Sequence, residues 1–190
     1  IPPLLVQAFL AAEDDNFCND GIAWITPKDL SDTENKYLKK GGTDITRKGL
    51  KTSSAKLMPA GSVLLTTRAP IGYLAIARNE VTTNQGFKSI VPKPEFGSEY
   101  VYYTIHSIVP KLQILGVGST FREISKEVFS KVPVALPPSE IINKFKKILN
   151  PLAQRKMQSE DEIHELTSLR RLAFAAADER TGAGKGCGGL

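Results

Sequence analysis

Cysteine and histidine are scarce in this sequence. It contains two cysteines, Cys18 and Cys187, and two histidines, His106 and His164. Neither pair has the spacing of a metal site, and two cysteines so far apart do not indicate a disulfide framework. The composition therefore predicts a protein without a metal centre, kept in a reducing compartment, and we expect it in the cytoplasm.

Motifs of nucleotide binding and nucleophilic catalysis are missing. The sequence has no Walker A motif, no G-x-G-x-x-G in a strand-to-helix context, no G-x-S-x-G and no C-x-x-C. Its two acidic clusters, at 13–15 and 160–162, have the composition of solvated faces. We therefore predict a binding protein and not an enzyme, with no cofactor bound by this chain.

Long hydrophobic runs are missing as well. The apolar opening segment "IPPLLVQAFLAA" covers residues 1–12, whereas a membrane-spanning helix needs about 20 apolar residues. This segment also lacks the basic start of a signal peptide. We expect no membrane association, and we expect the glycine-rich residues 179–190 to form a flexible tail.

Positive charge is present and unevenly distributed. The formal net charge of the chain is +5, yet residues 36–56 carry seven basic side chains against the single acid Asp44, a net of +6. The basic residues of this window are Lys36, Lys39, Lys40, Arg47, Lys48, Lys51 and Lys56. Such a surface favours a polyanionic partner. A solvated loop is the alternative interpretation.

Short strands and turns dominate residues 21–137. Strands are expected at "IAWI", from Ser62 to Thr66, at "YLAIAR" and at "FKSIVPK", and the close spacing of the last three predicts an antiparallel meander. Thr26 is expected to cap a helical turn that begins at Pro27. A longer helix is expected over "SEYVYYTIHSI", ending before Pro110.

The pattern changes after residue 138. From Glu140 to Ala177 there is one proline and no glycine, and the periodicity is helical throughout. A helix of this length exceeds what a core of the preceding residues can cover, so we expect it to pair with another element. A hairpin of two helices broken near Gln158–Glu160 is the alternative. The apolar positions of the expected seam are Ile142, Phe145, Leu149, Leu152, Ile163 and Leu166.

Several segments in order resemble one known family. They are "WITPKDL", "ITRKGLKTSSAKLMPAGSVLLTTRAPIGYLAIA", "TTNQGFKSIVP", "GSTFREISKEVFSKVPVALPP" and "ILNPLAQRKMQSEDEIHELTSLRRLAF". Together they resemble the DNA-specificity subunit of type I restriction–modification enzymes. That subunit usually holds two target-recognition domains, each followed by a long helix, so this chain resembles a half-subunit with a single recognition domain.

The resemblance implies an α+β fold in three parts. A target-recognition domain with a twisted, mainly antiparallel sheet and flanking helices is expected over 1–137. One long coiled-coil-forming helix is expected over 138–178, followed by the tail. The implied function is sequence-specific binding of double-stranded DNA, without catalysis by this chain.

The implied partners are the methyltransferase subunit and the motor and endonuclease subunit, which would carry S-adenosylmethionine, ATP and Mg²⁺. A second copy of the chain is expected to pair through the long helix at the seam positions named above. The alternative is a non-catalytic protein–protein interaction module that uses the long helix and has no specific DNA target.

Candidate DNA contacts come from polar and basic residues at strand ends and in loops. Arg68 can contact guanine or a phosphate, and pairing with a nearby carboxylate is the alternative. Asn84 and Gln85 suit adenine, and stabilisation of a turn is the alternative. The full set of predicted DNA-contacting residues is Thr26, Lys28, Lys48, Lys51, Ser53, Thr67, Arg68, Asn84, Gln85, Ser119, Thr120 and Arg122.

Overall fold

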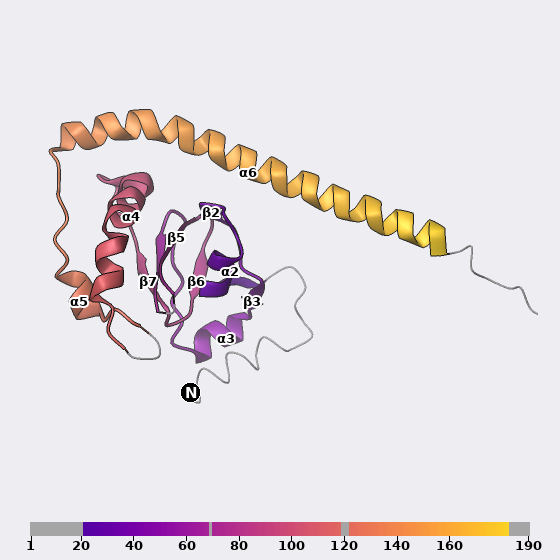
Figure 1. Ribbon diagram of the computed structural model, residues 1–190, viewed down its shortest axis with the longest axis horizontal. Coiled ribbons are helices and arrows are strands. Elements are labelled where there is room, and N and C mark those ends of the chain that lie inside the picture. Colours follow the sequence, from indigo (N-terminus) through magenta and orange to yellow (C-terminus); the bar gives the residue numbers. More distant parts are fainter. Residues whose placement is uncertain (1–20, 69, 119–121, 183–190) are drawn as a thin grey trace, which may run out of the picture. The chain divides into compact units, whose positions relative to one another are not determined.

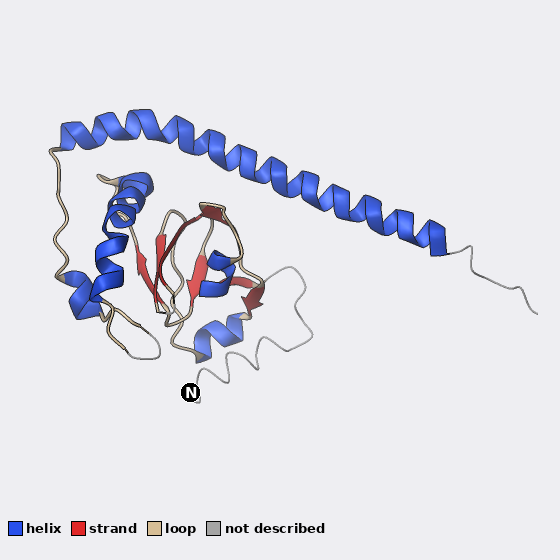
Figure 2. Cartoon of the chain, in the orientation of Figure 1, coloured by secondary structure: helices blue, strands red, loops and turns tan. Residues whose placement is uncertain are grey.

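The computed structural model describes residues 21–68, 70–118 and 122–182 (Figure 1). The chain divides into two compact units between Asn150 and Pro151, and each is described by itself. Figure 2 shows the mixed content of the first unit, in which helices surround short strands, as expected for an α+β fold. The elements are β1 (Ile22–Ile25), α2 (Pro27–Ser31), β2 (Tyr37–Leu38), β3 (Thr43–Ile45), α3 (Arg47–Thr52), β4 (Val63–Thr67), β5 (Ile71–Ala77), β6 (Val81–Thr83), β7 (Phe87–Ile90), α4 (Gly97–Leu115), α5 (Lys126–Ser130) and α6 (Ser139–Gly182).

The strands form two small sheets instead of one. The first has the order β3-β1-β6, with β3 antiparallel and β6 parallel to β1. The second has the order β2-β5-β4-β7, in which β4 pairs antiparallel with both β5 and β7 and β2 pairs parallel with β5. Most pairings are antiparallel, as the sequence predicts.

The expected meander of β4, β5 and β7 is wrong in its strand order. In a meander β7 would pair with β5, whereas here it pairs with β4. The reason is β6, which lies between β5 and β7 in the sequence and pairs with β1 in the other sheet. After β6 the chain re-enters the second sheet as β7, on the side of β4 that is opposite to β5.

Strand β4 is buried along its whole length because an apolar cluster covers each of its faces. Leu64 belongs to a cluster with Ala23, Ile25 and Val81. Leu65, the next residue, packs instead with residues of α4 and with Ile124. Successive side chains of a strand point to opposite faces, so the apolar run Val63–Leu65 at the start of β4 matches a central strand between two cores.

Helix α4 lies along β5 and continues past Pro110 to Leu115, which corrects the expected stop. An interior proline costs roughly 3 kcal/mol through the lost hydrogen bond and the ring clash. Leu112, in the turn after it, is fully buried in the cluster with Leu65 and Ile105. Burial of a leucine contributes about 1.5–3 kcal/mol, which offsets most of that cost.

Lys36 lies inside the first unit and not on the basic surface that the sequence predicts. Its ammonium group pairs with the carboxylate of Glu99 on α4, and both residues are buried. The Tyr37 hydroxyl donates to the same carboxylate. The Lys36 ammonium also lies 4.4 Å and 4.3 Å from the ring centroids of Tyr102 and Tyr103. Lys36 is therefore removed from the expected basic window.

Helix α6 is a single helix from Ser139 to Gly182 that contains Pro151. This confirms the long helix and contradicts the alternative of a hairpin of two helices. The helix also includes residues 179–182, which are predicted to belong to the tail. Ile142, expected to face a partner helix, is 5% exposed and packs within the first unit. Within the described residues, no helix combines the length and apolar character needed to cross a membrane. The tail residues 183–190 lie outside the described residues.

Candidate nucleic-acid interface

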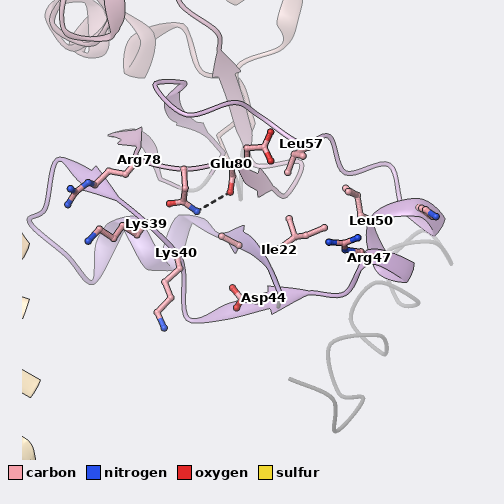
Figure 3. A pocket seen from close by; sticks show the side chains of 13 residues that line it. Ile22, Lys39, Lys40, Asp44, Arg47, Leu50, Leu57, Arg78 and Glu80 are labelled. Carbon is pink, nitrogen blue, oxygen red and sulfur yellow. Dashed lines mark hydrogen bonds between the residues drawn. The ribbon is translucent and has the colours of Figure 1, made fainter. Parts of the chain in front are cut away.

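A cavity of about 1010 Å³, here called the basic pocket, opens beside the first residues of β1. In Figure 3, Lys39, Lys40 and Arg78 lie toward one end of it and Arg47 toward the other, with Ile22 between them. Five basic side chains and two carboxylates line it, so its walls are positively charged. They are Lys39, Lys40, Arg47, Lys51 and Arg78, with Asp44 and Glu80.

Helix α3 places two of these cations. Thr46 caps its start, because the Thr46 hydroxyl oxygen accepts a hydrogen bond from the Gly49 amide at 3.0 Å. Arg47 and Lys51 are one helical turn apart, share a face and both line the basic pocket. Lys48 is exposed on α3 but does not line the pocket. The Thr46 cap thus fixes the start of α3, and the helix places Arg47 and Lys51 on the face that lines the basic pocket.

A second cavity of about 630 Å³, here called the polar pocket, lies at the other end of β1. It brings together three of the predicted DNA contacts, Ser53, Asn84 and Gln85. Lys88 of β7 and Lys126 of α5 also line it, although the sequence does not predict them as DNA contacts. These lysines are isolated in the sequence, so no local charge pattern marks them. The other residues of its lining are Trp24, Ser54, Ala55, Lys56, Met58, Thr83, Phe87, Ser89, Ile90 and Phe129.

The parallel pairing of β1 and β6 explains why segments far apart in the sequence meet here. Ile25 is the partner of Thr83, so α2 and the β6–β7 turn follow at the same edge of the sheet. Gly86 of that turn lies close to Pro27, since a Cβ atom on Gly86 would come within 3.2 Å of the proline Cγ. A side chain at position 86 would therefore crowd α2.

Asn84 and Gln85 have different roles in this turn. The Asn84 side-chain oxygen accepts a hydrogen bond from the Gly86 amide at 2.9 Å, which stabilises the turn. Gln85 is exposed at the same turn and lines the polar pocket. The turn-stabilising alternative therefore describes Asn84, while Gln85 has its side chain available for a ligand.

The segment between α3 and β4 separates the two pockets. Leu57 lines the basic pocket, whereas its neighbours Lys56 and Met58 line the polar pocket. Met58 is held by two backbone hydrogen bonds with Val81, at 2.7 Å and 3.0 Å. Since residues 47–58 contribute to both cavities, the pockets adjoin along this one stretch of chain.

The threonine pair at the end of β4 is buried. Thr66 and Thr67 are both fully inaccessible, at 0% exposure. The Thr66 hydroxyl accepts a hydrogen bond from the Tyr73 amide at 2.9 Å, and the Thr67 hydroxyl donates to the Gly86 carbonyl at 3.3 Å. These hydroxyls satisfy backbone groups where the pairing of β4 and β5 is irregular. This corrects the expectation that the Thr67 side chain faces DNA.

Arg68 and Arg122 both have partners within the chain. The Arg68 guanidinium lies 3.9 Å from a carboxylate oxygen of Glu123, with both side chains less than half exposed. This is the carboxylate pairing foreseen as the alternative. The Arg122 guanidinium donates to the Gln113 carbonyl at 3.4 Å. Ser119 and Thr120 lie outside the described residues.

Thr26 caps α2, as expected. The Thr26 hydroxyl oxygen accepts a hydrogen bond from the Asp29 amide at 3.4 Å, and the Asp29 carboxylate accepts one from the Thr26 amide at 2.7 Å, so the two residues form a capping box. The Thr26 hydroxyl also donates to this carboxylate at 2.6 Å. The same carboxylate accepts a hydrogen bond from the Gly42 amide at 2.7 Å. The Thr26 side chain is therefore used to cap α2, whereas Lys28 is exposed on that helix.

The two pockets differ in the chemistry they offer. Ammonium and guanidinium groups of the basic pocket suit the phosphates of a nucleic acid. Amide and hydroxyl groups of the polar pocket suit the edges of bases. Among residues 21–68, 70–118 and 122–182, no cluster of three or more histidine, cysteine or acidic side chains is suited to hold a metal ion.

Comparison with known sequences identifies relatives. The chain is 43% identical over 131 residues to the type I restriction enzyme MjaIX specificity subunit of Methanocaldococcus jannaschii, covering 68% of this chain and 30% of that protein. It is 31% identical over 150 residues to the EcoR124I/EcoR124II specificity subunit of Escherichia coli, covering 72% of this chain and 36% of that protein. The chain thus spans about a third of the length of these relatives.

Two solved structures share the fold. The HsdS subunit from Thermoanaerobacter tengcongensis matches with a TM-score of 0.54 at 20% identity, over 75% of this chain and 32% of that one. A chain from a structure of the type I R-M system matches with a TM-score of 0.54 at 23% identity, over 86% of this chain and 39% of that one. In sequence, residues 9–167 match the family described as Type I restriction modification DNA specificity domain. This match covers most of the chain, which therefore belongs to the type I restriction–modification DNA specificity family.

Proposed function

We propose that this chain binds double-stranded DNA in a sequence-specific manner, without catalysis of its own, and directs a type I restriction–modification assembly to its target. The observation that carries the proposal is that the basic and polar pockets adjoin along residues 47–58. A DNA-reading surface needs both phosphate contacts and contacts to base edges. The relatives that are named as specificity subunits support the same function.

The two pockets have different roles in the recognition of DNA. Lys40, Arg47 and Lys51 contact phosphates and give affinity that is independent of sequence. Ser53 and Gln85 meet base edges and give discrimination. Lys88 and Lys126 extend the positive charge beyond the basic pocket to the rim of the polar pocket.

Methyl transfer, ATP hydrolysis and cleavage belong to partner subunits in this proposal. A methyltransferase subunit would bring S-adenosylmethionine, and a motor and endonuclease subunit would bring ATP and Mg²⁺. The sequence of this chain supports the assignment, because it lacks nucleotide-binding and nucleophile motifs in the required context. The chain would act in the cytoplasm, where these subunits and cellular DNA meet.

The chain also forms a homodimer through α6 in this proposal. Beyond Pro151 the helix carries exposed apolar side chains, among them Leu152, Ile163 and Leu166, each more than half exposed. Ile142 and Phe145 pack within the first unit, so the pairing surface is shorter than the seam expected from the sequence. Burial of each large apolar side chain contributes about 1.5–3 kcal/mol, which is sufficient for association when several are paired.

The test is to select DNA from a random pool with the purified assembly and to sequence what is bound. We expect one enriched motif, with affinity that falls steeply as salt concentration rises, because phosphate contacts release counterions. The rival function is a protein–protein interaction module. It predicts no enriched motif and binding of DNA, if any, that is the same for all sequences.

A further inference from the structure

The first turns of α6 are held against α4 and the residues just before it by contacts of two kinds. The Phe145 ring meets the rings of Tyr100 and Tyr103 edge-on, with centroids 5.9 Å and 6.2 Å apart. The Lys146 ammonium donates to the backbone carbonyls of Pro94 at 2.8 Å and Glu95 at 2.7 Å. Apolar and polar contacts thus come from adjacent residues of one helix.

These contacts lie on one face of α6. Ile142, Phe145 and Lys146 are at positions i, i+3 and i+4, which share a helix face. Ile142 is buried, and Phe145 and Lys146 are half-buried, whereas Lys144 and Lys147 are exposed. We call Ile142, Phe145 and Lys146 the helix anchor.

The surface that receives the anchor is itself fixed to the core. Ser98 of α4 donates to the Gly61 carbonyl at 2.7 Å, and Tyr103 lies over the buried Lys36 ammonium. The Tyr100 hydroxyl donates at 3.1 Å to the Ala135 carbonyl in the segment that leads into α6. The anchor therefore packs against a part of α4 that is itself bonded to the rest of the first unit.

The position of Lys146 also gives a reason for a glycine at position 97. Gly97 has a backbone φ of +75°, which favours glycine, and a Cβ atom there would lie 3.1 Å from Lys146 Cε. The start of α4 is thus shaped to let the lysine side chain reach the two carbonyls. A helix that turned about its own axis, or slid by one turn, would lose the ring contacts and both hydrogen bonds together.

We propose that Phe145 and Lys146 are positioning residues, which fix the rotation and register of residues 139–150 of α6 on the recognition domain. This goes beyond DNA binding by the pockets, because it assigns a task to side chains that touch neither pocket. The proposal depends on contacts within the first unit and does not require that the bound ligand be DNA.

The test measures a distance within the full chain. Spin labels are placed at the exposed positions Lys111 of α4 and Lys144 of α6, with Cys18 and Cys187 replaced by serine, and the distance distribution is recorded by double electron–electron resonance. The wild-type background is expected to show one narrow distance. The variant with Phe145→Ala and Lys146→Met is expected to lose this single distance and give a broad distribution.

Matched variants separate positioning from stability. Lys147→Met with Ile148→Ala removes one lysine charge and one apolar side chain from exposed neighbouring positions of α6, and it should keep the narrow distance. Lys146→Arg retains donors for the carbonyls and should keep it as well. Fluorescence of the buried Trp24 reports whether the domain stays folded.

If the double variant does not fold, Lys146→Met alone is used, and it should broaden the distribution while Trp24 fluorescence stays native. A narrow, unshifted distance in the folded double variant, or in the folded Lys146→Met variant where the double variant does not fold, would overturn the proposal. A broad distribution in the wild-type background would overturn it equally.

Discussion

The ammonium group of Lys36 and the carboxylate of Glu99 form an ion pair inside the protein, with both side chains less than one-tenth exposed. The two residues are 63 positions apart and join the segment before β2 to α4. Removal of two charges from water is costly, and the hydroxyl of Tyr37 and the rings of Tyr102 and Tyr103 offset part of that cost. The arrangement is stable only while both charges are present.

Replacement of one member of this pair should therefore destabilise the domain strongly. Lys36→Met leaves the Glu99 carboxylate buried without its cation, and we expect the free energy of unfolding to fall by about 3–5 kcal/mol. Urea denaturation followed by the fluorescence of Trp24, the single tryptophan, measures the change. Lys93→Met, at an exposed lysine, is the control and should change stability by less than about 0.5 kcal/mol. Equal stability of the two variants would contradict the prediction.

The cations of α3 should contribute affinity without specificity. Lys48→Ala with Lys51→Ala removes two exposed lysines, of which Lys51 lines the basic pocket. It should weaken binding to all DNA sequences alike and lower the slope of log affinity against log salt by about one unit. Titrations at several salt concentrations measure the slope. Lys144→Ala with Lys147→Ala, two exposed lysines of α6, is the matched control. An unchanged slope in the α3 variant would mean that its lysines are merely solvated.

Gln85 should affect discrimination instead of general affinity. Gln85→Leu keeps the size of the side chain but removes its hydrogen-bonding groups, so we expect a loss of about 1–3 kcal/mol in the preference for the correct base pair at one position. Competition between the selected target and single-base variants measures this preference. Gln158→Leu, at an exposed glutamine of α6, should leave it unchanged. A uniform loss over all sequences would assign Gln85 to the phosphate contacts.

The pure chain should show neither methyl transfer nor DNA cleavage. Purified chain with target DNA, S-adenosylmethionine, ATP and Mg²⁺ is assayed for labelled methyl groups and for broken strands. We expect no product above that of a blank, and product once the partner subunits are added. Turnover that copurifies with this chain alone would refute the assignment of catalysis to the partners.

The apolar residues after Pro151 should hold two chains together. Light scattering at tens of micromolar is expected to give the mass of a dimer for the wild type. Leu152→Asp with Leu166→Asp places carboxylates on the proposed pairing surface and should give the mass of a monomer, because burial of an unpaired charge is costly. Gln154→Asp, at an exposed polar position, should remain dimeric. A monomeric wild type would contradict the homodimer.

Local patterns were sufficient for several features. The cap of α2 at Thr26 and the long helix α6 follow from a few neighbouring residues or from a regular period, and both are present. The order of the family segments along the chain predicted the family. The basic window also predicted most of the charged lining of the basic pocket, because four of its residues, Lys39, Lys40, Arg47 and Lys51, line that cavity.

Features that depend on distant contacts were decided by the tertiary structure. Lys36 resembles its basic neighbours in the sequence, yet Glu99 draws it into the interior. Thr67 was expected to face a ligand, but its hydroxyl satisfies a carbonyl of the β6–β7 turn. Lys126 of α5 lines the polar pocket together with Asn84 and Gln85 of that turn, from which it is distant in the sequence.

The same contrast applies along α6. Its periodicity predicts a seam with two apolar clusters, Ile142–Leu152 and Ile163–Leu166, on either side of the polar positions Lys156 and Ser159. The sequence by itself determines where these apolar residues lie on the helix. Only the tertiary structure decides that Phe145 packs against α4 while Ile163 stays exposed. The physical reason is that a period of 3.6 residues specifies which side chains share a face, whereas the free energy of burial depends on which surface that face meets.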